Sequence, residues 1–383
     1  MSVTAAAGFE AAGVEAGLRS GDGPDVALVV NRGPSAAAAA VFTSNRCTAN
    51  PIIWSKEVIK DGVVSAIVLN SGGANCYTGM LGFQTVHETA EAAGRALDLS
   101  PGDVLVCSTG LIGEQLDSTK VVAGVNRAAE ALRDSGGGDA ARAILTTDTH
   151  PKQAVRQGGG WTVGGMAKGA GMLAPGLATM LVVITTDADL ESADLDAALR
   201  SATRVTFDRL DSDGCMSTND QVTLLASGAS GVAPDLDEFT ALLTDLCRDL
   251  TLQLQGDAEG AAHDVAIEVR NAADEDDAVE VARAVARSNL FKAAVFGNDP
   301  NWGRVLAAVG TTSAEFDPFG IDVAMNGVQV CRAGQPDQPR ALVDLTDRAV
   351  QVSIDLHAGE ATATVWTNDL THDYVHENSA YSS

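Results

Sequence analysis

Short apolar runs alternate along this chain with longer amphipathic segments, and no other feature limits the possible folds as strongly. The runs have the length and apolar content of buried strands, and they lie at 26–30, 38–43, 65–70, 103–109 and 180–187. Apolar residues return at helical spacing at 85–99, 119–134 and 235–255. The glycine-rich stretch 134–143 predicts an exposed connection. Alternation of this kind is typical of helices layered on sheets, so the sequence predicts an α/β fold.

The pattern changes near residue 276, where short alternating segments begin. Asn326-Gly327 separates two such arms and predicts a type I′ hairpin. A second hairpin is expected at 349–369, around the sequence HAGE. Because 383 residues are too many for one ordinary core, we predict a main α/β domain at 1–275 and a smaller α+β domain at 276–383.

Charge and hydropathy exclude several classes of partner. The chain has 51 acidic and 25 basic residues, a formal net charge of −26, whereas a nucleic acid needs a basic face. No apolar run reaches the roughly 18 residues of a membrane span, and the first residues lack the basic start of a secretory signal. We therefore expect a cytoplasmic protein that binds neither nucleic acid nor membrane.

Cysteine and histidine usage predicts neither disulfides nor a metal. The six cysteines include no C-x-x-C pair, and the six histidines include no H-E-x-x-H. A phosphate-binding loop, a G-x-S-x-G elbow and a dinucleotide-binding motif are also missing. The sequence thus predicts no cofactor, and chemistry must come from ordinary side chains.

The segment MAKGAGMLAPGLATMLVVITTD, residues 166–187, runs from a glycine-rich stretch into an apolar strand, with Thr179 at the join. In one interpretation Thr179 is simply the first residue of a buried strand. In the other, its hydroxyl attacks the carbonyl of Ala178 and the chain is cut between them. The freed α-amine can then activate the hydroxyl as a nucleophile. Thr109 and Gly110, where a strand runs into a loop, can offer a hydroxyl and an N–H to an oxyanion.

Stretches from about residue 8 to residue 383 resemble, in the same order, those of the ornithine acetyltransferase family, the ArgJ-type enzymes of arginine biosynthesis. They are FTSNRCTANP, NSGGANCYTG, CSTGLIG, AILTTDTHPK, GGMAKGAGMLAP with LATML, TFDRLDSDGCMSTND, DAEG, FGNDPNWGRVLAAVG and ENSAYSS. Because the match extends over nearly the whole chain, it favours cleavage over the simple strand.

The resemblance implies a layered helix–sheet–sheet–helix fold of the N-terminal-nucleophile, aminopeptidase-like kind. It implies self-cleavage between Ala178 and Thr179 into an α chain, 1–178, and a β chain, 179–383, which assemble as an α2β2 heterotetramer. Thr179 would carry an acetyl group from N2-acetyl-L-ornithine to L-glutamate by a ping-pong mechanism. Thr109 and Gly110 match the family's oxyanion-hole pair.

The resemblance also implies a set of substrate-binding residues. They are Thr146 or Thr147, between which the sequence does not choose, together with Lys168, Thr179, Glu259, Asn378 and Ser383. Chemistry agrees, since both substrates bring a carboxylate and Lys168 is the only Lys or Arg between Arg156 and Arg200. Glu259 suits the side-chain ammonium of ornithine. The last residues must fold back to reach the site.

Two positions differ from the residues that the family commonly has, and several alternative functions remain open. Ala262-His263 stand where the family commonly has Thr-Lys, and Gly73 stands where it tends to have Asn. Some family members also use acetyl-CoA as donor. A related self-cleaving aminopeptidase or hydrolase would pass the acyl group to water, and a binding protein would keep the fold without cleaving.

Overall fold

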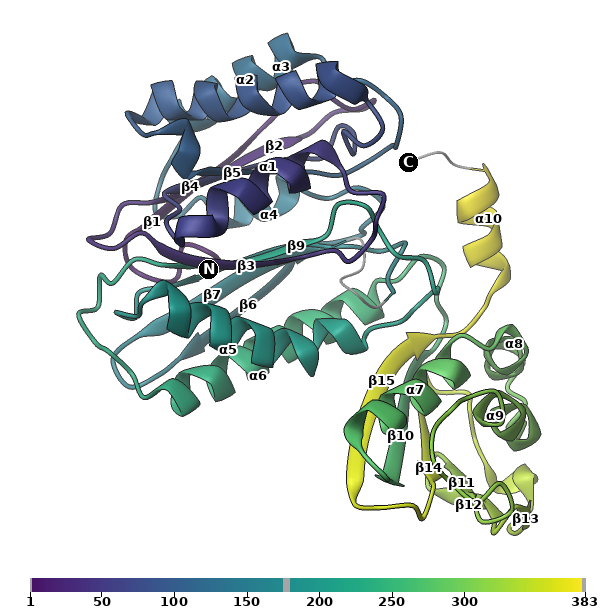
Figure 1. Cartoon of the computed structure of the whole chain (residues 1–383). Helices are drawn as coiled ribbons and strands as arrows, with labels where there is room; N and C mark the ends of the chain where they lie inside the picture. Colours follow the sequence, from purple (N-terminus) through teal and green to yellow (C-terminus); the bar gives the residue numbers. More distant parts are fainter. Residues whose placement is uncertain (1, 175–179, 381–383) are drawn as a thin grey trace.

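The computed structural model describes residues 2–174 and 180–380 (Figure 1). Two sheets lie face to face in the main body. The first has the order β1 (Phe9–Val14), β2 (Val26–Asn31), β4 (Ala66–Asn70), β5 (Val104–Ser108). The second has the order β3 (Ala37–Phe42), β9 (Gln221–Ala226), β8 (Leu181–Thr186), β7 (Thr162–Lys168), β6 (Lys152–Gln157). The pairs β4–β5 and β8–β9 are parallel, and the other neighbours in these two sheets are antiparallel.

Helices cover the outer face of each sheet. The first sheet carries α2 (Gly79–Leu97) and α3 (Ser118–Glu130), and the second carries α5 (Ser192–Arg204) and α6 (Leu236–Gly256) (Figure 1). Two shorter helices, α1 (Asn50–Val58) and α4 (Gly137–Ala143), add side chains to the core between the sheets. The predicted α/β class, with its helix–sheet–sheet–helix layers, is confirmed.

The apolar runs form these strands because both faces of each sheet are covered. Every residue of β2, β4 and β8 is buried, so both sides of each strand must be apolar. Ile67 and Leu105 of the first sheet pack with Met166 and Val183 of the second in a core between them. Aspartate side chains cap helices nearby; for example, Asp235 accepts hydrogen bonds from the N–H groups of Asp237 and Glu238 at the start of α6.

A third sheet follows, in the order β13 (Gln335–Pro336), β12 (Val328–Arg332), β11 (Asp322–Met325), β14 (Ala349–Asp355), β10 (Asp264–Ala272), β15 (Ala361–Asn368). Its core also takes side chains from α7 (Glu275–Ala286), α8 (Asn289–Phe296) and α9 (Trp302–Val309). The chain then forms α10 (His372–Ala380). Short 3-10 helices lie at Ile59–Asp61, Pro101–Asp103, Phe207–Arg209 and Arg340–Leu342. Since β10 is a strand of this sheet, the sheet begins at Asp264; the division into domains at 275–276 stays a prediction.

Two local predictions are tested by the strand pairing. The hairpin at Asn326-Gly327 is confirmed, with φ of 43° and 81° at the two turn residues between β11 and β12. The second hairpin is wrong, because β14 and β15 both pair with β10, which lies between them. The exposed connection at 134–143 is also wrong. Its Ala140 and Ala141 are fully buried in α4.

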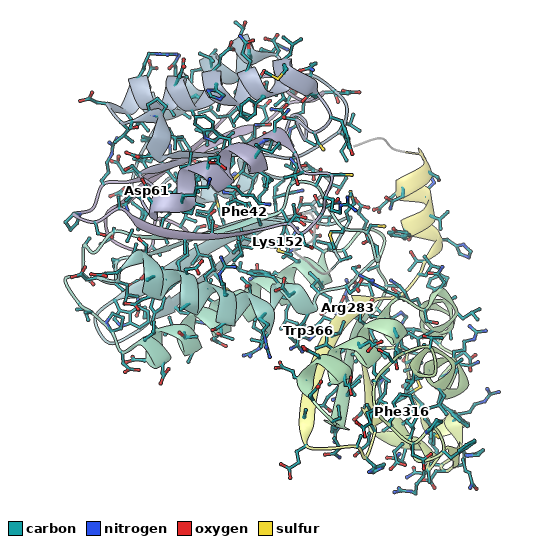
Figure 2. All side chains as sticks on the ribbon, viewed as in Figure 1. Phe42, Asp61, Lys152, Arg283, Phe316 and Trp366 are labelled. Atoms are coloured by element: carbon teal, nitrogen blue, oxygen red, sulfur yellow. The ribbon has the colours of Figure 1, made fainter. Side chains whose placement is uncertain are left out.

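Backbone and side-chain contacts join the third sheet to the layered body. The N–H of Asp211 donates to the carbonyl of Trp366 at 2.8 Å, and Arg283 donates to the carbonyl of Asp208 at 3.1 Å. Figure 2 labels Trp366 and Arg283 where the two parts meet, and Lys152 within the layered body. From the third sheet α10 extends beside the body (Figure 1). No helix in the described ranges is long and apolar enough to cross a membrane.

Candidate active site

The two proposed oxyanion residues lie directly after β5, where its carboxyl end meets the loop that follows β4. Thr109 is 2% exposed, and its N–H donates to the Asn70 carbonyl at 3.0 Å. Gly110 has a φ of 125°, and a Cβ there would lie 2.9 Å from the Gly73 backbone. Only glycine fits this close approach. The Gly110 N–H has no hydrogen-bond acceptor among the described residues, so it is free to bind an oxyanion.

The departure at Gly73 leaves this arrangement intact. A Cβ on Gly73 would lie 3.2 Å from a terminal methyl of Leu116, a side chain that can turn away. Glycine and the family's asparagine are therefore both compatible with the loop, and the oxyanion pair does not depend on which is present.

Lys168 ends β7 inside the protein, beside Thr109. The side chain is 1% exposed, and its Nζ donates to Thr146 Oγ1 at 2.7 Å and to Thr109 Oγ1 at 3.4 Å. Burial lowers the pKa of Lys168, although Asp148, at 3.7 Å, opposes that effect. Because Thr109 accepts this hydrogen bond, its own hydroxyl proton remains available to an oxyanion.

Asp148 holds the cations of this region in place. Its carboxylate accepts hydrogen bonds from Lys152 Nζ at 2.6 Å and from the Gly169 N–H at 2.7 Å. Burial raises the pKa of Asp148, but Lys168 and Lys152 outweigh it and lower the value to about 2. Lys152 also pairs with Asp257. The carboxylate of Asp148 therefore fixes the turn that follows Lys168 relative to the start of β6.

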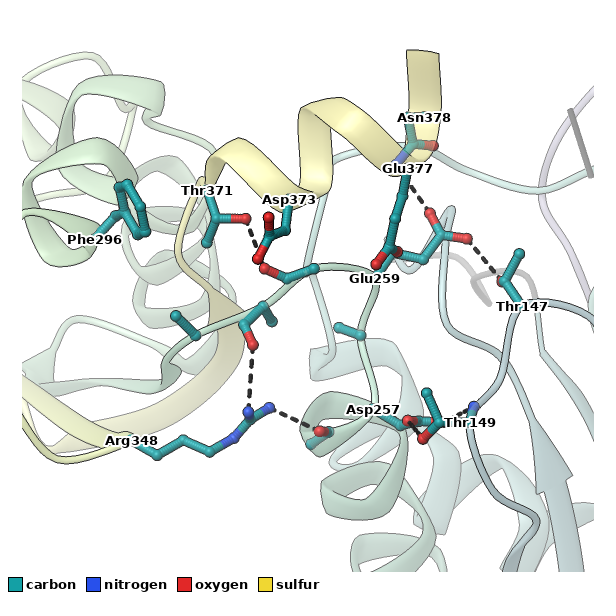
Figure 3. Close-up of a pocket in the computed structure, with 15 residues that line it drawn as sticks. Thr147, Thr149, Asp257, Glu259, Phe296, Arg348, Thr371, Asp373, Glu377 and Asn378 are labelled. Atoms are coloured by element: carbon teal, nitrogen blue, oxygen red, sulfur yellow. Dashed lines mark hydrogen bonds between the residues drawn. The ribbon is translucent and has the colours of Figure 1, made fainter. Parts of the chain in front are cut away.

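The carboxylate of Glu259 is held by hydrogen bonds from two different parts of the chain (Figure 3). Its Oε1 accepts from Thr147 Oγ1 at 2.7 Å, and its Oε2 accepts from Asn378 Nδ2 at 3.0 Å. A Cβ at Gly171 would lie 2.5 Å from Oε2. The tail helix α10 therefore reaches the site through Asn378, as the resemblance implies, and the carboxylate can still accept from a bound ammonium.

A cavity of about 620 Å³ opens beside Glu259 (Figure 3). Carboxylate side chains line it, those of Asp257, Glu259, Asp373 and Glu377. Arg348 also lines it, but its guanidinium pairs with Asp264 at 2.9 Å and 3.1 Å. The cavity therefore favours a cationic group over an anionic one.

The structure separates the two threonines between which the sequence does not choose. Thr146 faces Lys168, whereas Thr147 faces Glu259. The structure thus brings together Thr109 with Thr146 and Lys168, and Thr147 with Glu259 and Asn378. Ala178, Thr179 and Ser383 lie outside the described residues.

The sequence analysis included TFDRLDSDGCMSTND, residues 206–220, among the stretches that resemble the family, but it gave these residues no role. Asn219 donates to the carbonyls of Ala74 at 2.6 Å and Ser108 at 2.9 Å, which joins the loop after β4 to the end of β5, next to Thr109. Asp220 is fully buried and accepts from the Met180 N–H at 3.0 Å. Burial raises the pKa of Asp220. The sequence signal that could have pointed to Asn219 and Asp220 is the run of polar residues just before the buried strand β9.

Comparison with known proteins identifies the family. The model of the ArgJ family matches residues 10–383. The chain belongs to the ArgJ family. The Streptomyces coelicolor protein named "Arginine biosynthesis bifunctional protein ArgJ" is 62% identical over 383 residues and covers 100% of both chains. The Thermobifida fusca protein of the same name is 62% identical over 384 residues, again with 100% of both chains covered.

A solved structure is also similar to part of the chain. It is the ornithine acetyltransferase of Mycobacterium tuberculosis in complex with ornithine, 48% identical, with a TM-score of 0.45, and it covers 47% of this chain and 96% of that one.

Among the described residues of the ArgJ chain, no group of three or more His, Cys, Asp or Glu side chains is placed to hold a metal ion.

Proposed function

We propose that this chain is an arginine-biosynthesis acetyltransferase that moves an acetyl group from N2-acetyl-L-ornithine to L-glutamate. The observation that carries the proposal is the grouping of Thr109, Gly110 and Lys168 around one point, with Glu259 held nearby by Thr147 and Asn378. The names of its ArgJ relatives and of the Mycobacterium tuberculosis enzyme support the same activity.

The active form arises by cleavage of the precursor between Ala178 and Thr179. The Thr179 hydroxyl attacks the Ala178 carbonyl, the acyl group moves from nitrogen to oxygen, and water hydrolyses the resulting ester. The products are a carboxylate on Ala178 and a free α-amine on Thr179. That amine has an ordinary pKa of about 7.7–8.0, so it can accept the hydroxyl proton near neutral pH.

Acetyl transfer follows in two steps on the same hydroxyl. Thr179 attacks the acetyl carbonyl of N-acetylornithine, and the oxyanion receives hydrogen bonds from the Thr109 hydroxyl and the Gly110 N–H. The C–N bond breaks, and ornithine leaves with the proton on its α-amine. The α-amine of glutamate then attacks the acetyl ester, and Thr179 regains its proton as N-acetylglutamate leaves. Lys168 binds the substrate carboxylate, and Glu259 binds the side-chain ammonium of ornithine.

The two chains stay associated and form an α2β2 heterotetramer in the cytoplasm, without nucleic acid, membrane or cofactor. Contacts between residues before and after the cleavage point support a stable pair. The strands β7 and β8, which lie on either side of it, pair antiparallel over Val163–Lys168 and Leu181–Thr186.

Intact-mass spectrometry of the purified protein tests the cleavage. We expect two chains, one of which begins at Thr179, and a single 39.2 kDa chain without transferase activity for Thr179→Ala. Initial rates at varied donor and acceptor should give parallel double-reciprocal lines, because the acetyl group is held covalently between the two steps. An uncut wild-type chain, or transfer by Thr179→Ala, contradicts the proposal.

A second candidate activity is synthesis of N-acetylglutamate from acetyl-CoA and glutamate. The word "bifunctional" in the relatives' names favours it, because some members of the family have this second activity. Incubating the cleaved enzyme with acetyl-CoA and glutamate, without N-acetylornithine, tests it by thiol release. Release of acetate without transfer to glutamate would instead indicate a hydrolase.

A further inference from the structure

A second cavity, of about 430 Å³, lies beside Gly110 of the proposed oxyanion pair and beside Thr146. Gly110, Thr146 and Arg19 are among its lining residues. It shares no lining residue with the acidic cavity beside Glu259. The neighbouring residues Thr146 and Thr147 thus line two different cavities at one centre.

Arg19 is the only cationic side chain among the described residues that line the second cavity. Its side chain is half-buried, and Nη1 donates to the Leu145 carbonyl at 3.0 Å. In the part of the chain that the structure describes, no carboxylate pairs with it. Asp22 and Glu114 also line this cavity, but both are exposed to solvent. The Arg19 guanidinium is therefore able to form an ion pair with the carboxylate of a bound ligand.

The proposed reaction raises a charge problem that this cavity can solve. Donor and acceptor both react at Thr179, yet one has a cationic side chain and the other an anionic one. Glu259 suits the ammonium and repels the side-chain carboxylate of glutamate. Arg348, the cation that lines the acidic cavity, is already paired with Asp264. The glutamate side chain needs another cation.

We propose that the Arg19 cavity is the subsite for the side-chain carboxylate of the acceptor, and that Arg19 selects a dicarboxylate there. The proposal rests on the acetyltransferase function proposed above. Lys168 donates to Thr146 and Arg19 to Leu145, so two cations lie around adjacent residues, as the two carboxylates of glutamate require. Rotation about the Cα–Cβ bond lets an amino acid keep its α-amine at the acetyl ester and its α-carboxylate at Lys168 while the rest of its side chain turns toward one cavity or the other.

The test uses the cleaved full-length enzyme and three variants. Arg19→Gln removes the guanidinium charge, and Arg19→Lys keeps a cation. Arg127→Gln is the matched control, because Arg127 also donates to a backbone carbonyl of the same region, that of Glu15, but does not line the cavity. Two reactions are followed: acetyl transfer to glutamate, and exchange between N-acetylornithine and labelled ornithine, which needs no glutamate.

For Arg19→Gln we expect kcat/KM for glutamate to fall by about 10- to 150-fold, the range for one lost charge-assisted hydrogen bond. The exchange reaction should keep its rate, and the preference for glutamate over glutamine as acceptor should shrink by a similar factor. Arg19→Lys should retain most of that preference, and Arg127→Gln should match the wild type.

Two results would overturn the proposal. One is an unchanged glutamate-to-glutamine preference in Arg19→Gln, and the other is an equal fall of both reactions, which would indicate a structural role for Arg19. Failure of the proposed function gives a different result, since the wild-type enzyme would then catalyse neither the exchange nor the transfer.

Discussion

Replacing Glu259 with Gln should separate the two substrates of the proposed reaction. Gln has nearly the same shape, so it keeps the contact with Gly171 and can still accept from Thr147, while Asn378 can turn its carbonyl oxygen toward the new amide. What is lost is the negative charge that the ornithine ammonium meets. A charge-assisted hydrogen bond contributes about 1.5–3 kcal/mol, and each 1.36 kcal/mol is a factor of ten. We therefore expect kcat/KM for N-acetylornithine to fall by roughly 10- to 150-fold.

The acceptor half of the reaction should respond in the opposite sense or not at all. Loss of the carboxylate removes a repulsion on glutamate, so kcat/KM for glutamate, measured at saturating donor, should stay equal or rise. Glu88→Gln is the control, because Glu88 is a half-buried carboxylate on α2 that accepts a hydrogen bond from Gln84 and does not line the cavity beside Glu259. An equal fall for both substrates in Glu259→Gln would refute the assignment of Glu259 to the ornithine side chain.

Three further predictions follow from the same centre. Thr109→Ala should lower kcat by about 10²–10³-fold if its hydroxyl binds the oxyanion; a near-wild-type rate removes it from the site. Burial lowers the pKa of Lys168 below the ordinary 10.5, so this lysine loses its charge at a lower pH than an exposed lysine does. In a pH profile, the KM of both substrates should therefore begin to rise before pH 10.5 is reached. The pKa of Asp148 falls from 3.8 to about 2 on folding, so its carboxylate stabilises the fold by about 2 kcal/mol above pH ~4, and this is lost as pH falls toward 2. Urea unfolding should show that the free energy of unfolding of Asp148→Asn is lower than that of the wild type at pH 7, and that this difference becomes smaller in acid. A difference that does not change with pH contradicts the prediction.

Sequence patterns predicted the strands best where a strand is covered on both faces. The residues of β2 and β8 are all buried, which forces a continuous apolar run that is visible without a structure. The helix α4 was not visible, because its glycine-rich start reads as a loop. A Cβ at Gly136 would lie 1.8 Å from the Ala11 carbonyl oxygen, so this glycine is required by a close contact across the fold, which no local pattern reveals.

Pairing order was equally hidden from local patterns. The strands β14 and β15 are neighbours in sequence and alternate like the arms of a hairpin, but β10 lies between them. That arrangement depends on β10, which lies about eighty residues earlier in the chain. In its register, Asp264 pairs with Ala349 of β14 and with Asn368 of β15. Short connections favour a hairpin in any reading of the sequence alone.

The candidate site could be predicted from the sequence only with the help of the family resemblance, because its residues are far apart in the sequence. Thr147 and Glu259 are 112 residues apart, and Asn378 is a further 119 away. Residue chemistry could suggest that Lys168 meets a carboxylate, but it could not place Thr146 rather than Thr147 beside it. Asn219 was missed because its role is to bind the backbone carbonyls of a loop residue and of the last residue of β5, which any buried amide can do and which leaves no distinctive spacing.

The departure at Ala262-His263 bears on the acceptor, and the structure shows what these residues do instead. The N–H groups of both donate to Asp369 Oδ1 at 3.0 Å, and the His263 ring lies between Asp369 Oδ2, at 2.7 Å, and the Leu345 carbonyl, at 2.9 Å. His263 is therefore committed to the junction of β10 with the end of β15 and does not face Glu259. A lysine at this position would meet the same carboxylate. His263 thus belongs to a structural junction, whereas Ala262 also lines the cavity beside Glu259. Its methyl group brings no charge to that cavity, and the Arg19 variants test whether Arg19 supplies the cation for the side-chain carboxylate of the proposed acceptor.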